Sequence, residues 1–310
     1  MKPWQRIAGM AAWAGALLLH APAMSADLRL QPVGDGIYAI IGELDQRSPA
    51  NLGNNATFGA IVTTTGIVLI DSGGSQPGAA ALETLLRGLT DKPVVLVINT
   101  GGQDHRWLGN AHFKAKGAEI VASAAAVADQ KQRAAMQLQG IRELVGAAAA
   151  DATKPVHADR VFDAALDLTI GGVTLALRHA GPAHTPGDSF VWLPQHKIVF
   201  GGDIVYVERM LGVGPQSHAG RWISAFEAMA ALRPAIVVPG HGPPVSLAQA
   251  TAQTYDYLIF LRRAIGALIE RGGDLQQAAL IDQAPFMGLR VADQIARRNA
   301  MQVFQEMEFE

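Results

Sequence analysis

Five short segments of this 310-residue chain end an apolar run with a glycine-rich turn that carries aspartate or histidine. These segments read LIDSGG, VINTGGQDH, GPAHTPGD, VFGGDI and VVPGHG. Carboxylates and imidazoles bind divalent metals and transfer protons. Each turn taken alone is more often structural, but their joint occurrence indicates a metal or acid–base site. The chain has no cysteine, so any metal must depend on His, Asp or Glu.

Ligands in α/β folds gather where strands end, so the segments between these turns must form sheets. Runs rich in β-branched residues predict strands in residues 27–75, and a short apolar run predicts a buried strand at 93–99. Leucine spacing predicts a helix at 77–89, and the Ala-rich composition predicts another at 124–150. The second half repeats this order, and residues 247–310 are mainly helical, with breaks near Gly272–Gly273 and Pro285. We therefore expect two sheets covered by helices.

With these turns in this order, the mature chain resembles the metallo-β-lactamase-fold hydrolases, most closely the periplasmic branch found alongside quinoprotein dehydrogenases. The resemblance implies an α/β fold, an αββα sandwich of two mixed sheets flanked by helices. It also implies a small-molecule substrate, and the association with a quinoprotein dehydrogenase is implied by the resemblance alone. The matching site residues are Asp71, Asp104, His105, His184, Asp203 and His241.

The sequence departs from the family at the head of its main metal motif, His-x-His-x-Asp-His. Asn99–Thr100 is followed by Gly101, Gly102 and Gln103, so no histidine lies between Asn99 and Asp104. By family resemblance, the first metal site would keep only His184 and Asp203, too few ligands for tight binding. The flexible Gly101–Gly102 pair is suited to a sharp turn that directs the following residues at one ion.

The second site of the family would be complete in this chain. By resemblance its ligands are Asp104, His105 and His241, with Asp203 as the bridging residue. This set suits one Zn²⁺ ion, with Fe or Mn as alternatives, and leaves room for a water. Asp71 would organise the turn beneath the ligands.

The expected function is a hydrolase that uses a metal-activated water on an ester, thioester, lactone or lactam. The expected catalytic residues are Asp203, His184 and Asp104, where Asp203 holds or deprotonates the water. His184, free of a metal, would serve as a general acid/base or as an oxyanion donor. The alternative is an inactive member of the fold that serves as a binding or accessory protein.

Residues 1–26 have the layout of a secretory signal peptide, with Lys2 and Arg6 before an apolar run and cleavage expected after Ala23 or Ala26. An uncleaved membrane anchor is the alternative. Removal of this segment changes the formal charge from -2 to -4, because it holds two bases and no acid. We expect a periplasmic or secreted protein that binds no nucleic acid and has no stable membrane span after cleavage.

The mature chain is expected to form one metallo-β-lactamase-like domain at residues 27–250, with a C-terminal helical extension at residues 251–310 packed on it. This extension could also form a dimer, and the sequence leaves that open. Trp107 and Trp222 could line a pocket or pack in the core. Arg209 lies in a glycine-rich loop that could border the substrate site, although a solvated surface is the more common situation.

Overall fold

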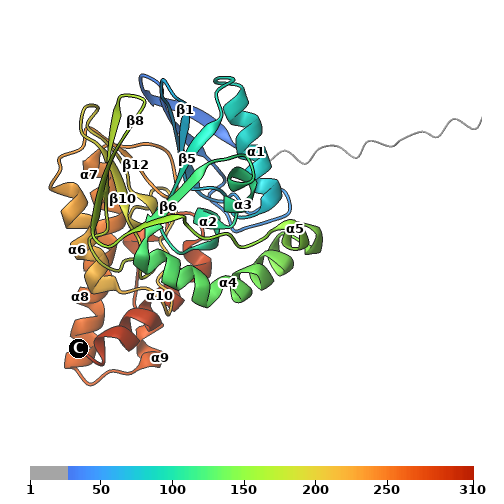
Figure 1. Cartoon of the computed structure of the whole chain (residues 1–310). Helices are drawn as coiled ribbons and strands as arrows, with labels where there is room; N and C mark the ends of the chain where they lie inside the picture. The colour runs from blue at the N-terminus through green and yellow to red at the C-terminus, as the bar shows by residue number, and fades with distance from the viewer. Residues whose placement is uncertain (1–26) are drawn as a thin grey trace, which may run out of the picture.

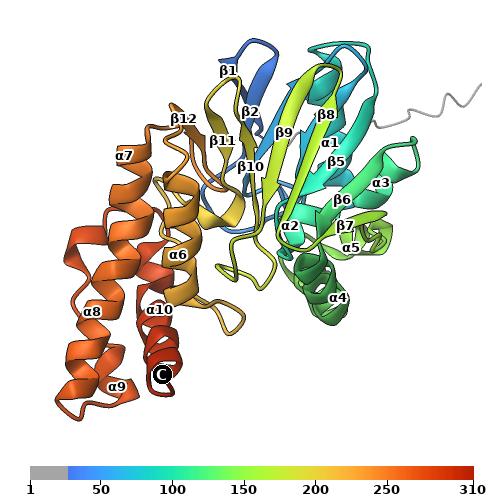
Figure 2. The same ribbon diagram turned by 60° about the vertical axis from the view of Figure 1, so that its left-hand side comes forward.

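The computed structural model describes residues 27–310, so the proposed signal peptide at residues 1–26 lies outside the described residues. Two β-sheets stand face to face at the centre of the molecule, as Figure 2 shows. One has seven strands in sequence order from β1 to β7, and the other has five in the order β12-β11-β10-β9-β8. Both are mixed, because antiparallel hairpins adjoin parallel pairs such as β4–β5 and β11–β12.

The strands of the larger sheet are β1 (Arg29–Gly34), β2 (Ile37–Ile41), β3 (Thr57–Val62), β4 (Ile67–Ile70), β5 (Val94–Asn99), β6 (Glu119–Ser123) and β7 (Arg160–Phe162). Those of the smaller sheet are β8 (Ala165–Ile170), β9 (Val173–Arg178), β10 (Phe190–Leu193), β11 (Ile198–Phe200) and β12 (Ile236–Val238). The turn between β8 and β9 is the Gly171–Gly172 pair, and β10 and β11 form an antiparallel hairpin.

The central strands are apolar on both faces because each sheet is covered on both sides. In β4, Val68 and Ile70 point into the core between the two sheets, whereas Ile67 and Leu69 point into a second core under the outer helices. This alternation follows from the two-residue period of a strand. It explains why the β4 sequence reads as an unbroken apolar run.

Helices cover the two outer faces, as Figures 1 and 2 show. On the side of the larger sheet they are α1 (Gln76–Arg87), α2 (Asp104–Trp107), α3 (Asn110–Lys114), α4 (Ala124–Leu144) and α5 (Ala147–Ala152). The others are α6 (Ala219–Ala230), α7 (Leu247–Ala250), α8 (Asp256–Glu270), α9 (Leu275–Ala278) and α10 (Ala292–Met307), with short segments η1 (Gly202–Ile204), η2 (Thr251–Tyr255) and η3 (Ala284–Phe286). The layers confirm the predicted αββα sandwich.

The C-terminal helices share one apolar core with the smaller sheet. Leu261 of α8 and Phe304 of α10 belong to the same buried cluster as Trp222 of α6 and Ile204 of η1. The helical region is interrupted after Glu270 and around Pro285, as expected from its glycines and proline. None of the described helices is long and apolar enough to span a lipid bilayer.

Candidate metal centre

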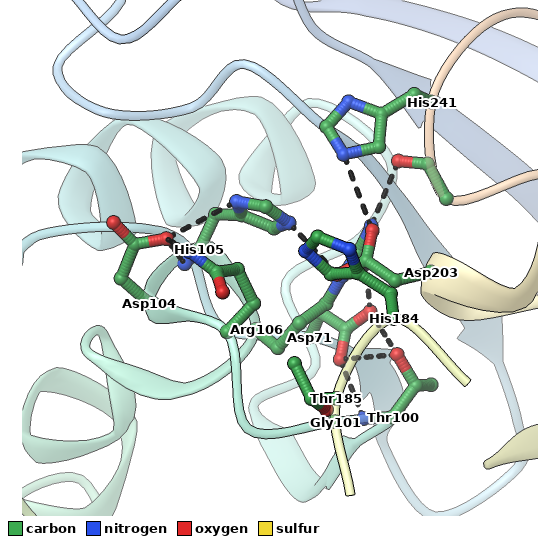
Figure 3. A network of polar contacts seen from close by, with 12 residues as sticks. Asp71, Thr100, Gly101, Asp104, His105, Arg106, His184, Thr185, Asp203 and His241 are labelled. Carbon is green, nitrogen blue, oxygen red and sulfur yellow. Dashed lines mark hydrogen bonds and ion pairs between the residues drawn. The ribbon is translucent and has the colours of Figure 1, made fainter. Parts of the chain in front are cut away.

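The carboxyl ends of β4, β5, β11 and β12 bring four sequence-predicted turns to one edge of the sandwich. Asp71 follows β4, Asp203 lies in η1 after β11, and His241 follows β12. The turn after β5 leads into α2, which carries His105. Figure 3 shows these side chains converging on Asp203, which is completely buried.

His105, Asp203 and His241 form a compact group of metal-binding type, with one ligand atom from each within 4.8 Å of the others. His105 Nε2 lies 3.2 Å from Asp203 Oδ2, and His241 Nε2 lies 3.2 Å from Asp203 Oδ1. The three residues are at most 2% exposed. Two imidazoles and one carboxylate are a protein ligand set that catalytic zinc sites use.

The state of these groups fits a divalent cation. Burial lowers the pKa of His241 well below its usual value, so the ring is neutral and able to ligate. Its Nδ1 has no hydrogen-bond partner among the described residues, and its Nε2, 3.2 Å from Asp203 Oδ1, makes no well-aligned hydrogen bond, although both nitrogens are buried. Burial by itself would raise the pKa of Asp203, but Arg106 and the two histidines hold it well below the usual range. Asp203 is therefore ionised, and a cation between its carboxylate and Nε2 of His241 would give that buried nitrogen a partner.

Arg106 organises this site, and the sequence analysis did not identify it. The side chain is completely buried and donates from Nε and Nη2 to the two carboxylate oxygens of Asp203, at 3.1 and 2.7 Å. Nη1 donates to Asp71 Oδ2 at 2.9 Å and to the Thr57 carbonyl, and Nη2 also donates to the Gly240 carbonyl. A carboxylate offers about four lone pairs, so these bonds leave Asp203 with acceptors for a metal.

Asp71 has the supporting position expected for it. Its carboxylate accepts hydrogen bonds from the Thr100 amide at 2.7 Å and from the Thr100 hydroxyl. Its backbone is left-handed, with φ of 65°, a conformation that aspartate tolerates better than most residues. Asp71 thus fixes the end of β5 and one edge of the Arg106 guanidinium, and it is not part of the group around Asp203.

The structure does not bring Asp104 into the His105–Asp203–His241 group. Asp104 and His105 are consecutive residues of the helix α2, in which successive side chains diverge by about 100°. Asp104 instead pairs with Arg47, from the loop between β2 and β3. Burial opposes its ionisation, but Arg47 and His105 hold the pKa of Asp104 below its usual value.

The turn at residues 101–103 is packed against polar side chains of α4. Gln130 donates to the Gly101 carbonyl, and Gln137 and Arg133 donate to the Gly102 carbonyl. A Cβ atom on Gly102 would lie 1.9 Å from an oxygen of Asp129, and one on Gly101 would lie 2.3 Å from an oxygen of Asp188. Both positions therefore require glycine while these carboxylates remain, and the site has no room for histidines there.

His184 lies beside the site without joining the three-residue group. Its Nδ1 is 2.8 Å from the Gly212 carbonyl oxygen, which can only accept, so Nδ1 carries the proton. Burial lowers the pKa of His184 to about 4, although the charge of Asp203 and the Gly212 carbonyl favour the protonated form. The ring is therefore neutral at pH 7, and its Nε2 is a hydrogen-bond acceptor.

The remaining residues singled out from the sequence are two tryptophans and one arginine, and all three are buried. Trp107 and Trp222 are completely buried and belong to apolar clusters. Arg209 is nearly buried and donates to the Leu44 and Asp45 carbonyls, which lead to Arg47. Tyr206, which the sequence analysis did not consider, stacks on His241 with ring centroids 4.4 Å apart. Nothing in the spacing of Arg47, Arg106 or Tyr206 could have identified them, because their partners are distant in sequence.

Residues 53–241 match the model of the metallo-β-lactamase superfamily, which is more than half of the chain. The chain belongs to this superfamily. The match includes every residue of the group around Asp203 and ends before the C-terminal helices. It confirms the superfamily inferred from the turns, whereas it does not test the particular branch or the loss of the first two histidines.

Solved structures of this superfamily are similar in fold. The metallo-β-lactamase from Pontibacter korlensis is 21% identical, with a TM-score of 0.58 over 75% of this chain and 99% of that one. The metallo-β-lactamase FIM-1 from Pseudomonas aeruginosa, in its mono-zinc form, is 17% identical, with a TM-score of 0.60 over 76% of this chain and 97% of that one.

A stereoselective inverting sec-alkylsulfatase from Pseudomonas sp., Pisa1, is 20% identical, with a TM-score of 0.68. The match covers 90% of this chain and 50% of that one, so this chain spans about half of the alkylsulfatase. Because the superfamily model ends at residue 241 and this coverage is larger, the match must include part of the C-terminal helices. At these identities, the solved structures establish the fold alone.

Proposed function

We propose that this protein is a hydrolase that holds one divalent metal, zinc by preference, with His105, Asp203 and His241. The observation that supports it most is the buried Nε2 of His241, which makes no well-aligned hydrogen bond although it lies 3.2 Å from an ionised Asp203. Zinc favours such nitrogen and oxygen donors, with iron or manganese as alternatives. The proposal keeps the single-metal hydrolase inferred from sequence. It moves Asp104 from the set of metal ligands to a supporting position beside His105.

Each protein group has a defined task in this proposal. A bound ion would supply Lewis acidity and an activated water. Asp203 would hold the proton of that water on the oxygen lone pairs that Arg106 leaves free, and Arg106 keeps this carboxylate in place. His184 would accept a hydrogen bond at Nε2 and so orient the nucleophile. It would not serve as an oxyanion donor, because its single proton is on Nδ1.

The substrate class stays as inferred from sequence: an ester, thioester, lactone or lactam of a small molecule. The alkylsulfatase similarity adds sulfate esters to the compounds worth testing, although that activity belongs to the neighbour. The proposal includes secretion to the periplasm after removal of residues 1–26, and an association with a quinoprotein dehydrogenase. Mass spectrometry of protein recovered from the periplasm tests the export step, which requires a mature chain that begins after Ala23 or Ala26.

A metal-free binding or accessory protein is the second candidate. Two observations favour it: the guanidinium of Arg47 contacts His105, and the three proposed ligands are almost completely buried. Under this alternative, the polar contacts around Asp203 would only stabilise the fold.

Metal analysis of the purified mature protein separates these candidates. We expect about one equivalent of zinc in the wild type and loss of most of it in His241→Ala, because that variant removes one of three protein ligands. His196→Ala is the matched control, since His196 is an exposed residue of the β10–β11 turn and should leave the zinc content unchanged. A wild-type protein without bound metal after incubation with zinc would exclude the metal-dependent hydrolase.

A panel of ester, thioester, lactone, lactam and sulfate-ester substrates then tests for hydrolysis. We expect turnover that disappears with a chelator and returns with zinc. Zinc binding without turnover of any class would instead favour a metal-binding accessory protein.

A further inference from the structure

The two ring nitrogens of His105 face different partners. Nε2 points to Asp203, 3.2 Å from Oδ2. Nδ1, on the other side of the ring, lies 2.9 Å from Arg47 Nη2 and 3.3 Å from Asp104 Oδ1. Figure 3 shows this arrangement, with Asp104 and Asp203 on opposite sides of the imidazole. Arg47 and Asp104 also contact each other, so both compete for the same ring nitrogen.

These two partners demand opposite tautomers of His105. A guanidinium can only donate, so a bond from Arg47 requires a lone pair on Nδ1 and places the proton on Nε2. An ionised carboxylate can only accept, so a bond to Asp104 requires the proton on Nδ1 and leaves a lone pair on Nε2. A neutral imidazole has one proton. On Nε2 the proton faces Asp203 and leaves Nδ1 to accept from Arg47, whereas on Nδ1 it faces Asp104. Only the tautomer that Asp104 selects can bind a metal through Nε2.

We propose that Asp104 and Arg47 are opposing positioning residues that control metal binding by selecting the tautomer of His105. Asp104 favours the tautomer that ligates, and Arg47 favours the tautomer that does not. This inference rests on the metal site proposed above. It also assigns Asp104 a task, since a carboxylate behind a metal-binding histidine is a common arrangement in metalloproteins.

Arg47 has the freedom that this exchange requires. Its described hydrogen bonds come from Nη2, and its buried Nε has no hydrogen-bond partner among the described residues. The guanidinium can therefore leave Nδ1 without breaking a larger network. It would still neutralise Asp104 from a slightly different position.

The C-terminal helices hold the loop that carries Arg47. Asp45 accepts two hydrogen bonds, at 2.6 and 2.5 Å, from Arg290, which lies just before α10. Gln46 donates to Gln294 of α10 at 3.3 Å, and Arg209 donates to the Asp45 carbonyl at 2.8 Å. Arg290 and Gln294, which hold the loop that places Arg47 over His105, therefore lie beyond the superfamily match, which ends at residue 241.

Zinc affinity of three purified, metal-free variants tests the proposal, with competition against a chromophoric chelator as the measurement. We expect Arg47→Met to bind Zn²⁺ about tenfold or more tightly than wild type, because the competing donor is gone. We expect Asp104→Asn to bind it about 10–100-fold more weakly, the usual effect of losing such a supporting partner. Circular dichroism of each variant confirms that the fold is intact.

Arg133→Met is the matched control for charge. Arg133 is also ion-paired with an aspartate, Asp129, and also borders the 101–103 turn, but it does not contact His105. Its removal changes the net charge near the site as Arg47→Met does. Equal strengthening of zinc binding by the two variants would overturn the proposal, because charge alone would then explain the effect.

The tautomer itself gives a readout independent of zinc and of activity. Long-range ¹H–¹⁵N spectra of the imidazoles distinguish a protonated Nε2 from a protonated Nδ1. Without metal, we expect mainly the Nε2-protonated form of His105 in wild type, which Asp203 also accepts from, and a larger share of the Nδ1-protonated form in Arg47→Met. The same tautomer in both proteins, with unchanged zinc affinity, would overturn this inference and leave the metal site standing. Absence of zinc binding in wild type and in every variant would overturn both proposals.

Discussion

The buried guanidinium of Arg106 ties together segments that are far apart in the chain. It links Asp203 after β11 with Asp71 after β4, and it also binds the carbonyls of Thr57 in β3 and Gly240 after β12. A planar cation with five donors suits this task, since lysine could not bind both oxygens of Asp203 and reach Asp71. The shape and charge of the proposed metal ligand therefore depend on a residue that does not itself bind the metal.

Replacement of Arg106 should be severe. Arg106→Met leaves Asp203 and Asp71 buried without their counter-ion, and removing one partner of a buried pair costs about 3–5 kcal/mol. Urea denaturation of the metal-free protein measures this loss of unfolding free energy. The matched control is Arg178→Met, which removes a partly exposed ion pair with Asp167 and should change stability by about 0.5 kcal/mol or less. Similar effects in both variants would mean that Arg106 does not organise the site.

At the scale of elements, α4 packs its polar side chains against the turn at residues 101–103. Its Gln130, Arg133 and Gln137 side chains donate to the carbonyls of Gly101 and Gly102. The turn is therefore a packed and hydrogen-bonded feature of this chain.

Alanine at two glycines separates close packing from helix propensity. Gly102→Ala places a Cβ 1.9 Å from Asp129 and should destabilise the protein by about 1–3 kcal/mol. Gly140→Ala, in the last turns of α4, meets no atom within 4 Å and should stabilise the protein by about 0.5–1 kcal/mol. Thermal and urea denaturation measure both. Stabilisation of the protein by Gly102→Ala would contradict the close approach of Asp129 to the turn.

At the scale of the whole molecule, the C-terminal helices are part of the same apolar core as the smaller sheet. They bury side chains against α6 and η1, and they also hold the loop that carries Arg47. A segment with these contacts should not unfold on its own, because its separation would expose a large apolar surface.

A core substitution in α8 tests this coupling. Leu261→Ala removes a completely buried side chain and should lower the unfolding free energy by about 2–5 kcal/mol. Tryptophan fluorescence and circular dichroism should report one transition that shifts as a whole, since Trp107 and Trp222 lie in different parts of the sandwich. Ile259→Ala, on the exposed face of the same helix, should have little effect. Two separated transitions in Leu261→Ala would show that the extension unfolds independently.

The sequence by itself determined the fold and the location of the candidate site. Apolar runs that end in Asp- or His-bearing turns are local patterns, and strand ends meet at one edge of a sheet. His105, His184, Asp203 and His241 lie in these turns, and the family resemblance marked them as candidate site residues. Which of them converge was decided by tertiary structure, because side-chain direction depends on whether a residue is in a turn or a helix.

Asp104 and Arg106 show the physical reason. Asp104 was expected to share an ion with its neighbour His105, but its carboxylate lies on the Nδ1 side of that ring, 3.3 Å away, and pairs with Arg47. The importance of Arg106 comes from partners between 35 and 134 positions away, and that of Arg47 from partners 57 and 58 positions away. No spacing along the chain encodes such contacts, because the packing of two sheets and the C-terminal helices creates them.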